Sequence, residues 1–298
     1  MIKRTLLFSS PAHLKTKDEQ LVFEHAETGE VKSVPIEDIG VVVLEHKQIT
    51  RSAALLAKLI DNNAAVVTCD DSHLPNGLFM PLQGHSIQTA RMRTQIEASI
   101  PLTKQLWQQT VQAKIKNQAA VLAYYNIPIQ NMLHWAAEVR SGDPDNFEAR
   151  AAAYYWKNIF GVESSFNRER FGEPPNNFLN YAYAILRACV ARSLVGSGLL
   201  PTFGIHHKNQ YNAYCLADDI MEPFRPYADK LVRDLINNLK GEELILSPAS
   251  KKQLLNLPII DVSIENKTGP LMVGLQTTTA SLAACFEKRS RKISYPEM

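Results

Sequence analysis

The chain of 298 residues has few cysteines and no long hydrophobic run. Its four cysteines are separated by 120, 26 and 70 residues, so no CxxC pair or zinc-ribbon spacing occurs, and reduced thiols are the simplest interpretation. No stretch approaches the roughly 18–20 apolar residues of a membrane span. Near the N-terminus, the apolar run Leu6-Leu7-Phe8 is too short for the core of a signal peptide. These absences argue against a disulfide-stapled, secreted or membrane-spanning protein and predict a cytoplasmic one.

Internal repeats and low-complexity tracts are also missing. What is present is the composition of a folded globular protein, with 45% hydrophobic and 21% charged residues. The length predicts about two domains at roughly 150 residues each. This composition excludes a wholly disordered chain, a collagen-like repeat and a coiled-coil rod.

The hydrophobic pattern changes near residue 85. Before it, short β-branched or aromatic runs predict strands, with Pro75-Asn76-Gly77 as a turn and Thr50 as the N-cap of a single helix. After it, apolar residues recur at helical spacing, as in 101–125. We therefore expect an α+β protein with a β-rich, sandwich-like domain over 1–85 and a larger all-α domain over 86–298. The predicted strands are 5–8, 20–23, 39–44 and 64–69.

The two parts also differ in charge. Residues 1–89 hold 8 Lys/Arg and 11 Asp/Glu, a net of −3, whereas the rest of the chain holds 24 and 19, a net of +5. Each basic cluster in the second part is by itself typical of a solvated helix face, but the net charge favours this part as the one that meets a polyanion. The basic clusters are Arg91/Arg93, Arg168/Arg170, Lys251-Lys252 and 288–292.

Acidic and imidazole groups concentrate at three places in the second part, of which Glu148 is the first. It lies near the start of a predicted helix that runs toward Phe160. With Asp145 as N-cap and Glu148 at N3, the pair predicts a capping box. A helix N-terminus also suits a carboxylate that faces a cation, so the box leaves a second role open.

The other two places are His206-His207 and the acidic turn that ends at Glu222. Adjacent histidines usually point in different directions, so at most one is expected to be a ligand. Asp219 and Glu222 are three residues apart and share a helical face, where like charges repel. Their compensation must come either from Arg225 or from a metal ion.

Spacing limits how these groups can meet. His207 precedes Asp219 by 12 residues and Glu222 by 15. A continuous helix would separate His207 from Asp219 by about 18 Å, so a shared site requires His207 either on the preceding loop or at a bent helix start. One imidazole with two or three carboxylates is an oxygen-rich donor set, which favours Mg²⁺ or Mn²⁺ over structural zinc.

These residues resemble those of the CRISPR-associated spacer-acquisition integrase family, most strongly its type II variant. The resemblance rests on Gly204-Ile205-x-His207, on the stretch 219–226 and on the stretch 177–186, and it extends over most of the chain. It implies a β-rich domain that mediates homodimerisation and a helical domain that holds a divalent metal.

The same resemblance implies roles for particular residues. The family's metal-binding glutamate, histidine and distal carboxylate map onto Glu148, His207 and Glu222, with Mg²⁺ or Mn²⁺ as the cofactor. Asp219 is a further acidic member of the metal site, and the aspartate that some relatives use as a ligand corresponds to either Asp218 or Asp219. His207 is either a ligand or a general acid or base, and the sequence leaves that choice open.

The reaction that the resemblance implies is attack by the 3′-hydroxyl of a short DNA duplex on a phosphodiester at the repeat boundary of a CRISPR array, catalysed by Glu148, His207 and Glu222. The implied partners are double-stranded DNA, a second copy of the chain and a small CRISPR-encoded companion protein. Lys208 and Arg225 are candidates for holding the scissile phosphate, although Arg225 equally suits a pair with an acidic neighbour.

Two other functions stay open. A His-Asp phosphohydrolase would require an adjacent His-Asp pair, which the sequence lacks. A non-catalytic DNA-binding scaffold would tolerate loss of the carboxylates, but it gains nothing from Asp218, Asp219 and Glu222 beside a phosphate surface. The acidic groups therefore favour the enzyme.

Overall fold

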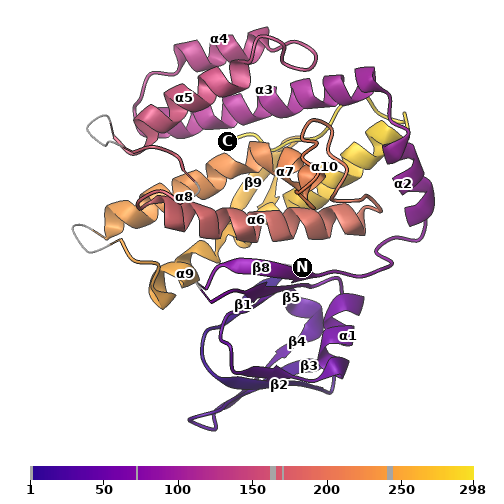
Figure 1. The fold of residues 1–298 in the computed structure, drawn as a ribbon, viewed down its shortest axis with the longest axis vertical. Coiled ribbons are helices and arrows are strands. Elements are labelled where there is room, and N and C mark those ends of the chain that lie inside the picture. Colours follow the sequence, from indigo (N-terminus) through magenta and orange to yellow (C-terminus); the bar gives the residue numbers. More distant parts are fainter. Residues whose placement is uncertain (1–2, 72, 162–165, 170, 240–243) are drawn as a thin grey trace. The chain divides into compact units, whose positions relative to one another are not determined.

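A computed structural model of the chain describes residues 3–71, 73–161, 166–169, 171–239 and 244–298 (Figure 1). Of the predicted basic clusters, Arg170 lies outside these residues. Contacts divide the chain into two compact units, residues 1–84 and 85–298. The first is β-rich and the second is mostly helical, so the predicted fold class is confirmed.

The first unit contains two four-stranded mixed sheets. In one sheet, with the order β1-β5-β7-β8, the first three strands are parallel and β8 is an antiparallel edge. In the other, with the order β4-β3-β2-β6, only the β2–β6 pair is parallel. The elements are β1 (Arg4–Phe8), β2 (Ala12–Lys17), β3 (Gln20–His25), β4 (Val31–Pro35), η1 (Ile36–Asp38), β5 (Ile39–Leu44), β6 (Ile49–Arg51), α1 (Ala53–Asp61), β7 (Ala65–Cys69) and β8 (Pro75–Phe79).

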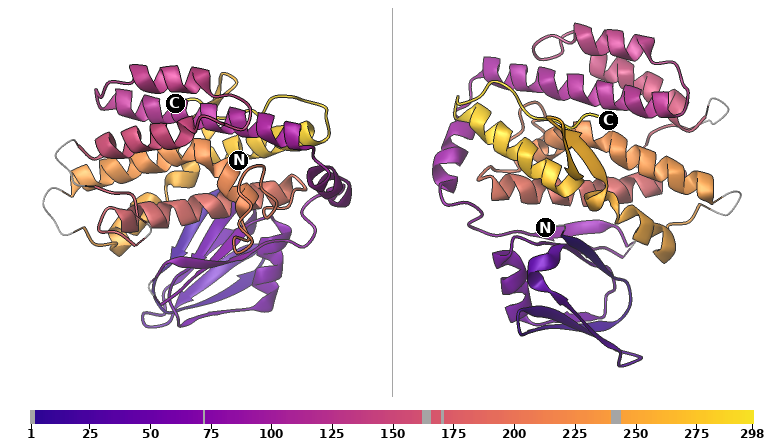
Figure 2. Two further views of the ribbon diagram at one scale, coloured as in Figure 1. Left: turned by 45° about the horizontal axis from the view of Figure 1, so that its top comes forward. Right: turned by 180° about the vertical axis from the view of Figure 1, so that it is seen from behind.

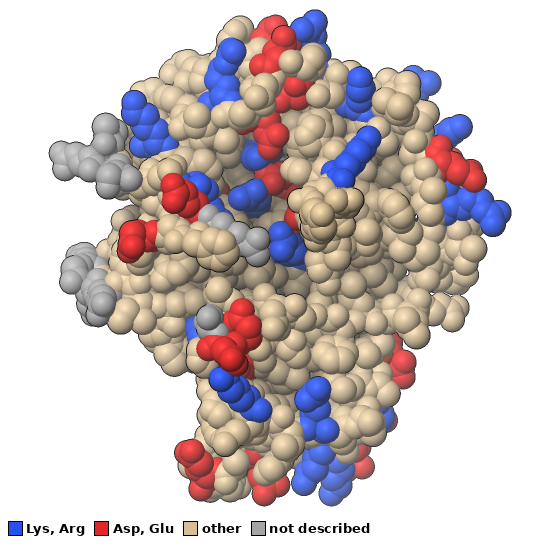
Figure 3. All heavy atoms as spheres, viewed as in Figure 1, with Lys and Arg blue, Asp and Glu red and all other residues tan. Residues whose placement is uncertain are grey.

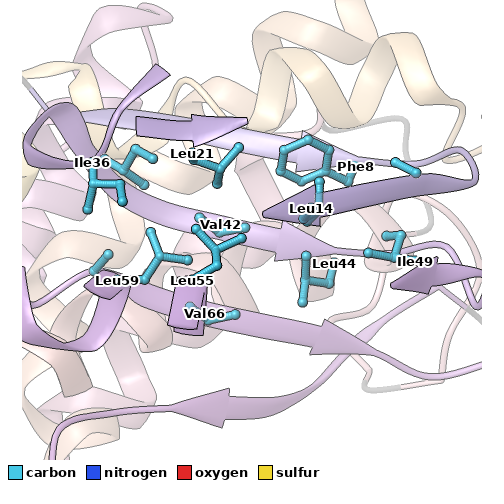
Figure 4. Close-up of a cluster of buried hydrophobic side chains, with 13 residues drawn as sticks. Phe8, Leu14, Leu21, Ile36, Val42, Leu44, Ile49, Leu55, Leu59 and Val66 are labelled. Atoms are coloured by element: carbon cyan, nitrogen blue, oxygen red, sulfur yellow. The ribbon is translucent and has the colours of Figure 1, made fainter. Parts of the chain in front are cut away.

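Both sheets and α1 share one apolar core (Figure 4). Strand β5 is buried along its whole length, as is typical of a central parallel strand. Leu14 and Leu21 from one sheet meet Val42 from the other, while Leu55 and Leu59, four residues apart on one face of α1, complete the cluster. The core therefore lies between two sheets, in agreement with a sandwich-like arrangement.

Two local predictions for this unit are wrong. The N-cap of α1 is Ser52, whose hydroxyl accepts a hydrogen bond from a backbone N–H in the first turn, and not Thr50. Pro75–Gly77 begins strand β8 instead of forming a turn. Gly77 pairs with Thr68, and a Cβ at Gly77 would lie 2.3 Å from the Thr68 hydroxyl, so this glycine serves a close approach between strands.

The second unit is built around two long helices, α3 and α6 (Figure 2). Helix α3 contacts α4, α5 and α8, whereas α6 contacts α7, α8 and α10. A β-hairpin, which the sequence did not predict, precedes α10. No helix among the described residues is both long and apolar enough to cross a membrane. The elements are α2 (Gln88–Ile96), α3 (Ile100–Tyr124), α4 (Gln130–Glu138), α5 (Phe147–Ile159), α6 (Asn176–Gly196), α7 (Cys215–Met221), η2 (Glu222–Phe224), α8 (Arg225–Asn238), α9 (Pro248–Leu254), η3 (Leu257–Ile259), β9 (Asp261–Ile264), β10 (Lys267–Pro270) and α10 (Leu271–Phe286).

Candidate functional site

Glu148 lies in the first turn of α5, where the predicted capping box is wrong. The cap position belongs to Asn146, which has a left-handed backbone with φ of 55°. This bend lets the Asp143 carboxylate accept hydrogen bonds from the backbone N–H of Glu148, at 2.9 Å, and of the residue before it. Asp145 instead pairs with Arg140. The Glu148 side chain is therefore not used in capping and is free to meet another group.

His207 lies on the loop before α7, where the spacing argument allowed it, and is anchored there by Asp219. Asp219 is fully buried, and its Oδ1 accepts a hydrogen bond of 2.5 Å from His207 Nδ1 and one of 3.2 Å from the His207 backbone N–H. Its Oδ2 accepts the backbone N–H of His206 at 3.0 Å. The hydrogen bond that His207 donates to the Asp219 carboxylate raises the pKa of His207, against the effect of burial. Both Asp219 oxygens are thus engaged by the loop.

Gly204 explains part of the motif around His207. A Cβ at this position would lie 2.4 Å from the His207 carbonyl oxygen and 2.7 Å from Asp219 Oδ2. Any side chain here would therefore push the loop away from the Asp219 carboxylate. The glycine is needed for this close approach, and the hydrogen bonds to Asp219 depend on it.

Trp107 of α3 supports the histidine loop. The His206 ring stacks on the buried Trp107 indole, with centroids 4.0 Å apart and planes 5° apart. The His207 ring meets the same indole edge-on at 5.8 Å. The two histidine rings, with centroids 5.3 Å apart, stand at 87° to each other against the same indole. His206 thus has a packing role on the tryptophan.

Lys114, also on α3, lies between the two predicted glutamates. Its Nζ is 2.7 Å from Glu148 Oε1 and 2.6 Å from Glu222 Oε2. The contact with Glu148 is a hydrogen bond, whereas that with Glu222 Oε2 lies outside hydrogen-bond geometry, and this buried oxygen has no other hydrogen-bond partner among the described residues. Burial lowers the pKa of Lys114, but the two glutamates raise it above its usual value. One ammonium therefore joins two carboxylates from α5 and η2.

Arg225 fixes the other oxygen of Glu222. Its guanidinium donates a 2.7 Å hydrogen bond to Glu222 Oε1 and lies 4.3 Å from the centroid of the Tyr183 ring. Burial alone would raise the pKa of Glu222, but Arg225 and Lys114 lower it to about 2. Arg225 and Lys114 together therefore provide the positive charge that the acidic turn required.

A buried acid lies below this pair. Asp229 of α8 accepts hydrogen bonds from the hydroxyls of Tyr155, at 3.0 Å, and of Tyr183. Burial raises its pKa to about 6, although both tyrosines and two arginines, Arg225 and Arg168, oppose the shift. Tyr183 thus joins the Asp229 carboxylate to the arginine that holds Glu222.

Asp218 and Asp219 have different surroundings despite being adjacent. Asp218 forms a two-pronged pair with Arg187, at 2.6 and 3.1 Å, and accepts a hydrogen bond from Asn212. Asp219 faces the histidine loop. The structure therefore distinguishes the two aspartates that the sequence left open, and it associates only Asp219 with His207.

Asn117 connects the Glu222 turn to the end of the described chain. Its side-chain amide donates to the carbonyl oxygens of Pro223, at 2.8 Å, and of Pro296, at 2.9 Å. About two turns earlier on α3, the Thr110 hydroxyl bonds to that of Tyr295 at 2.8 Å. Residues 294–298 therefore lie against the helix that carries Lys114.

The structure brings Glu148 and Glu222 together at Lys114, and it pairs His207 with Asp219. The two glutamates also raise the pKa of His207. Among the described residues, no group of three or more His, Cys, Asp or Glu side chains is already arranged to hold a metal ion. Lys114 occupies the space between the two glutamates. The donor set nevertheless fits a hard divalent cation, since it contains a buried carboxylate oxygen without a hydrogen bond and an imidazole fixed through Nδ1.

The sequence analysis missed the contribution of α3. Trp107, Lys114 and Asn117 lie on one face of this helix, since they are seven and three residues apart. A sequence signal for these residues existed: the polar Lys114 and Asn117 lie on the same buried side of the helix as Val111 and Ile115.

Several side chains of the predicted basic clusters form hydrogen bonds inside the unit. On the surface, acidic and basic side chains intermingle (Figure 3). Arg91 donates to Glu287 and to the Ser197 carbonyl, and Arg168 donates to two asparagines of α6. Lys251 is buried, so the interpretation as a solvated face is wrong for it. Net charge therefore overstates the number of cations available to a polyanion.

Residues 5–256 match the sequence model of the CRISPR-associated protein Cas1 family. A relative from Neisseria meningitidis serogroup C, named CRISPR-associated endonuclease Cas1, is 36% identical over all of this chain and 97% of its own length.

Two solved structures have a similar fold. One is a casposase bound to an integration product, with a TM-score of 0.81 and 20% identity, which covers 98% of this chain and 92% of the other. The second is a Cas6-RT-Cas1–Cas2 complex, with a TM-score of 0.73 and 18% identity over 98% of this chain and 36% of the other.

Proposed function

Because the chain belongs to the Cas1 family of CRISPR-associated proteins, we propose that it is a divalent-metal-dependent DNA integrase and endonuclease that inserts short duplexes into a CRISPR array. In the proposed reaction, a 3′-hydroxyl attacks a phosphodiester at the repeat boundary. The new phosphodiester bond forms as the bond to the leaving 3′-oxygen breaks. The observation that supports this proposal is the meeting of Glu148 and Glu222 at Lys114, in the same unit in which Asp219 holds His207.

The donor set for the metal is one carboxylate each from Glu148 and Glu222, together with His207 Nε2. These hard oxygens and one imidazole suit Mg²⁺ or Mn²⁺. A bound metal would stabilise the charge on the phosphoryl group and make the attacking hydroxyl more acidic. Glu222 Oε1 is held by Arg225, which leaves Oε2 for the metal.

We assign Asp219 to the positioning of His207 rather than to direct coordination. Its oxygens accept three hydrogen bonds from the histidine loop, so they are poorly placed to bind a cation as well. A proton donated from Nδ1 to Asp219 fixes the ring and directs the Nε2 lone pair outward. Lys208 is exposed on the same loop and is proposed to contact the scissile phosphate.

The proposed partners are double-stranded DNA, a second copy of the chain bound through the β-rich unit, and a small CRISPR-encoded companion. The resemblance to the Cas1–Cas2 complex supports the companion. Phosphate contacts would supply most of the DNA affinity and make it sensitive to salt. We expect the protein to act in the cytoplasm, where the array lies.

The test is strand transfer in the full-length protein. Labelled duplexes with free 3′-hydroxyls are offered to a repeat-containing plasmid, with the companion protein, in Mg²⁺ or Mn²⁺ and with or without EDTA. We expect joining to disappear with EDTA and to fall at least about 100-fold in His207→Ala and Glu222→Ala, since each removes a ligand. Gel shifts over a salt series separate lost chemistry from lost DNA binding.

His134→Ala and Glu138→Ala are matched controls, because both side chains are exposed in the same unit. They should join DNA like the wild type. Joining that survives in His207→Ala and Glu222→Ala would reject the site, and joining that is absent from the wild type with intact DNA binding would favour a scaffold.

A further inference from the structure

We propose that Lys114 is a built-in counter-ion for Glu148 and Glu222, which a divalent metal must displace to enter the site. The inference rests on the proposed function, because it concerns how the same site receives its metal. Lys114 is then a regulator of metal affinity, distinct from the ligands.

The geometry makes the ammonium and a metal competitors. Lys114 Nζ lies within 2.7 Å of one oxygen of each glutamate, and its side chain is 9% exposed. Mg²⁺ binds carboxylate oxygens at about 2.0–2.1 Å and tolerates little distortion. A metal held by the same two oxygens would therefore need the space that the ammonium fills.

Charge points in the same direction. Lys114 and Arg225 balance the charges of Glu148 and Glu222 within these ion pairs. A dication bound between the two glutamates would lie next to the Lys114 ammonium, and the two positive charges would repel each other. If Lys114 withdraws, two negative charges of the glutamates are left for the metal and Arg225.

The two cations differ in how firmly they hold Glu222. Arg225 makes a hydrogen bond to Oε1, whereas Lys114 contacts Oε2 outside hydrogen-bond geometry. A lysine on a flexible aliphatic stem can leave this oxygen, while the planar guanidinium of Arg225, which also lies over the Tyr183 ring, stays. Arg225 then keeps Glu222 oriented in both states, and Lys114 is the exchangeable cation.

Without metal, the lysine has a second consequence. The buried Glu222 and the half-buried Glu148, with one arginine, would carry an excess negative charge, which is costly where water is largely excluded. Lys114 offsets this charge, so the site can fold and persist before metal arrives. The same contact lowers the affinity for metal.

The experiment measures Mn²⁺ binding to the full-length protein by calorimetry and by the loss of the free Mn²⁺ resonance signal. Wild type is compared with Lys114→Met, Lys114→Gln and Lys116→Met, the last being exposed on the same helix. Both Lys114 variants should bind Mn²⁺ about tenfold more tightly or better, since the metal no longer breaks charged contacts. Lys116→Met should match the wild type.

Thermal unfolding gives an independent readout. Both Lys114 variants should melt lower than wild type without metal and show a larger rise in Tm when Mn²⁺ is added. Lys114→Gln keeps an N–H donor for the carboxylates, so it carries the comparison if Lys114→Met fails to fold without metal.

Equal or weaker Mn²⁺ binding by folded Lys114 variants, with normal binding by the wild type, would overturn this inference and leave the proposed function intact. If the wild type binds no Mn²⁺ under any condition, the proposed metal site fails and the inference with it. Tighter binding by the Lys114 variants alone supports both.

Discussion

The two units of the molecule treat buried charge in opposite ways. Among the described residues of the first unit, Glu45 is the one buried polar side chain, and the core between the sheets is apolar throughout. The second unit buries Lys114, Asp219, Glu222 and Asp229, each matched to a partner.

This difference separates stability from chemistry. An apolar core stabilises without fixing any particular reactive group, whereas a buried pair of charges contributes little net stability but holds its members in defined positions. The β-rich unit therefore has the character of a structural unit, and the helical unit accepts the cost of desolvated charges at the place where the site lies.

The largest expected effect tests the apolar side of the comparison. Leu21 is fully buried in the first unit, so Leu21→Ala should lower the unfolding free energy of that unit by about 2–5 kcal/mol. Hydrogen exchange of the β5 and β7 amides measures the loss. Mn²⁺ affinity should stay within about twofold of the wild type. A tenfold weaker affinity would show that the two units are not separate in function.

The next effect concerns the ionisation of Asp229. Because burial raises its folded pKa from 3.8 to about 6, the folded state holds the proton more tightly than the unfolded state. Its stabilising contribution is present below about pH 4 and is lost as pH rises to about 6. The shift of about two units corresponds to about 3 kcal/mol.

Asp229→Asn cannot ionise and therefore lacks this dependence. The stability of the wild type minus that of the variant should fall by up to this amount between pH 4 and 7, as measured by denaturant unfolding at each pH. A stability difference that stays constant with pH would mean that the pKa of Asp229 is not raised by folding. The buried charges of the helical unit would then be fully compensated.

A smaller effect comes from comparing the two neighbouring aspartates. Asp219→Ala removes the acceptor of the hydrogen bond from His207 Nδ1, so Mn²⁺ affinity should fall about 10- to 100-fold. Asp218→Ala breaks the pair with Arg187 and the hydrogen bond from Asn212, neither of which involves His207, and should change the affinity less than threefold. Calorimetric titration of both variants decides the matter, and equal losses would remove the distinction between them.

The smallest effect compares the same type of change in each unit. Ser52→Ala and Asp143→Ala both remove a side chain that caps a helix, and each should cost about 1 kcal/mol of stability. Only Asp143→Ala should also weaken Mn²⁺ binding, because its helix carries Glu148. Thermal unfolding and metal titration of the two variants test this. An equal change in Mn²⁺ affinity in both variants would contradict the assignment of metal binding to the helical unit.

The sequence predicted the elements in which local pattern and tertiary structure agree. Strand 39–44 was correct residue for residue, since a run of β-branched residues suits a buried central strand. The rise of a helix over the 12 residues between His207 and Asp219 predicted His207 either on the preceding loop or at a bent helix start, and the structure has the loop. The capping of α5 was missed because the left-handed Asn146 lets Asp143 reach the helix, and no hydrophobic period encodes such a bend.

The role of Lys114 was missed for a different reason. A lysine on a helix is usually solvated, and only the approach of Glu148 and Glu222 from other elements makes this one internal. Those contacts join residues far apart in the chain, so neither composition nor spacing could reveal them. The predicted ligands carry a recognisable motif, whereas the residues that position them do not.

The hydrogen bonds of Asn117 also set an order of events during protein synthesis. Residues 294–298 leave the ribosome more than 70 residues after Glu222, so a growing chain can hold every proposed ligand before Pro296 reaches Asn117 and Tyr295 reaches Thr110. Until then, the Glu222 turn has support from one side only. The contacts of Pro296 and Tyr295 with α3 therefore form later in synthesis than those among the proposed ligands and Lys114.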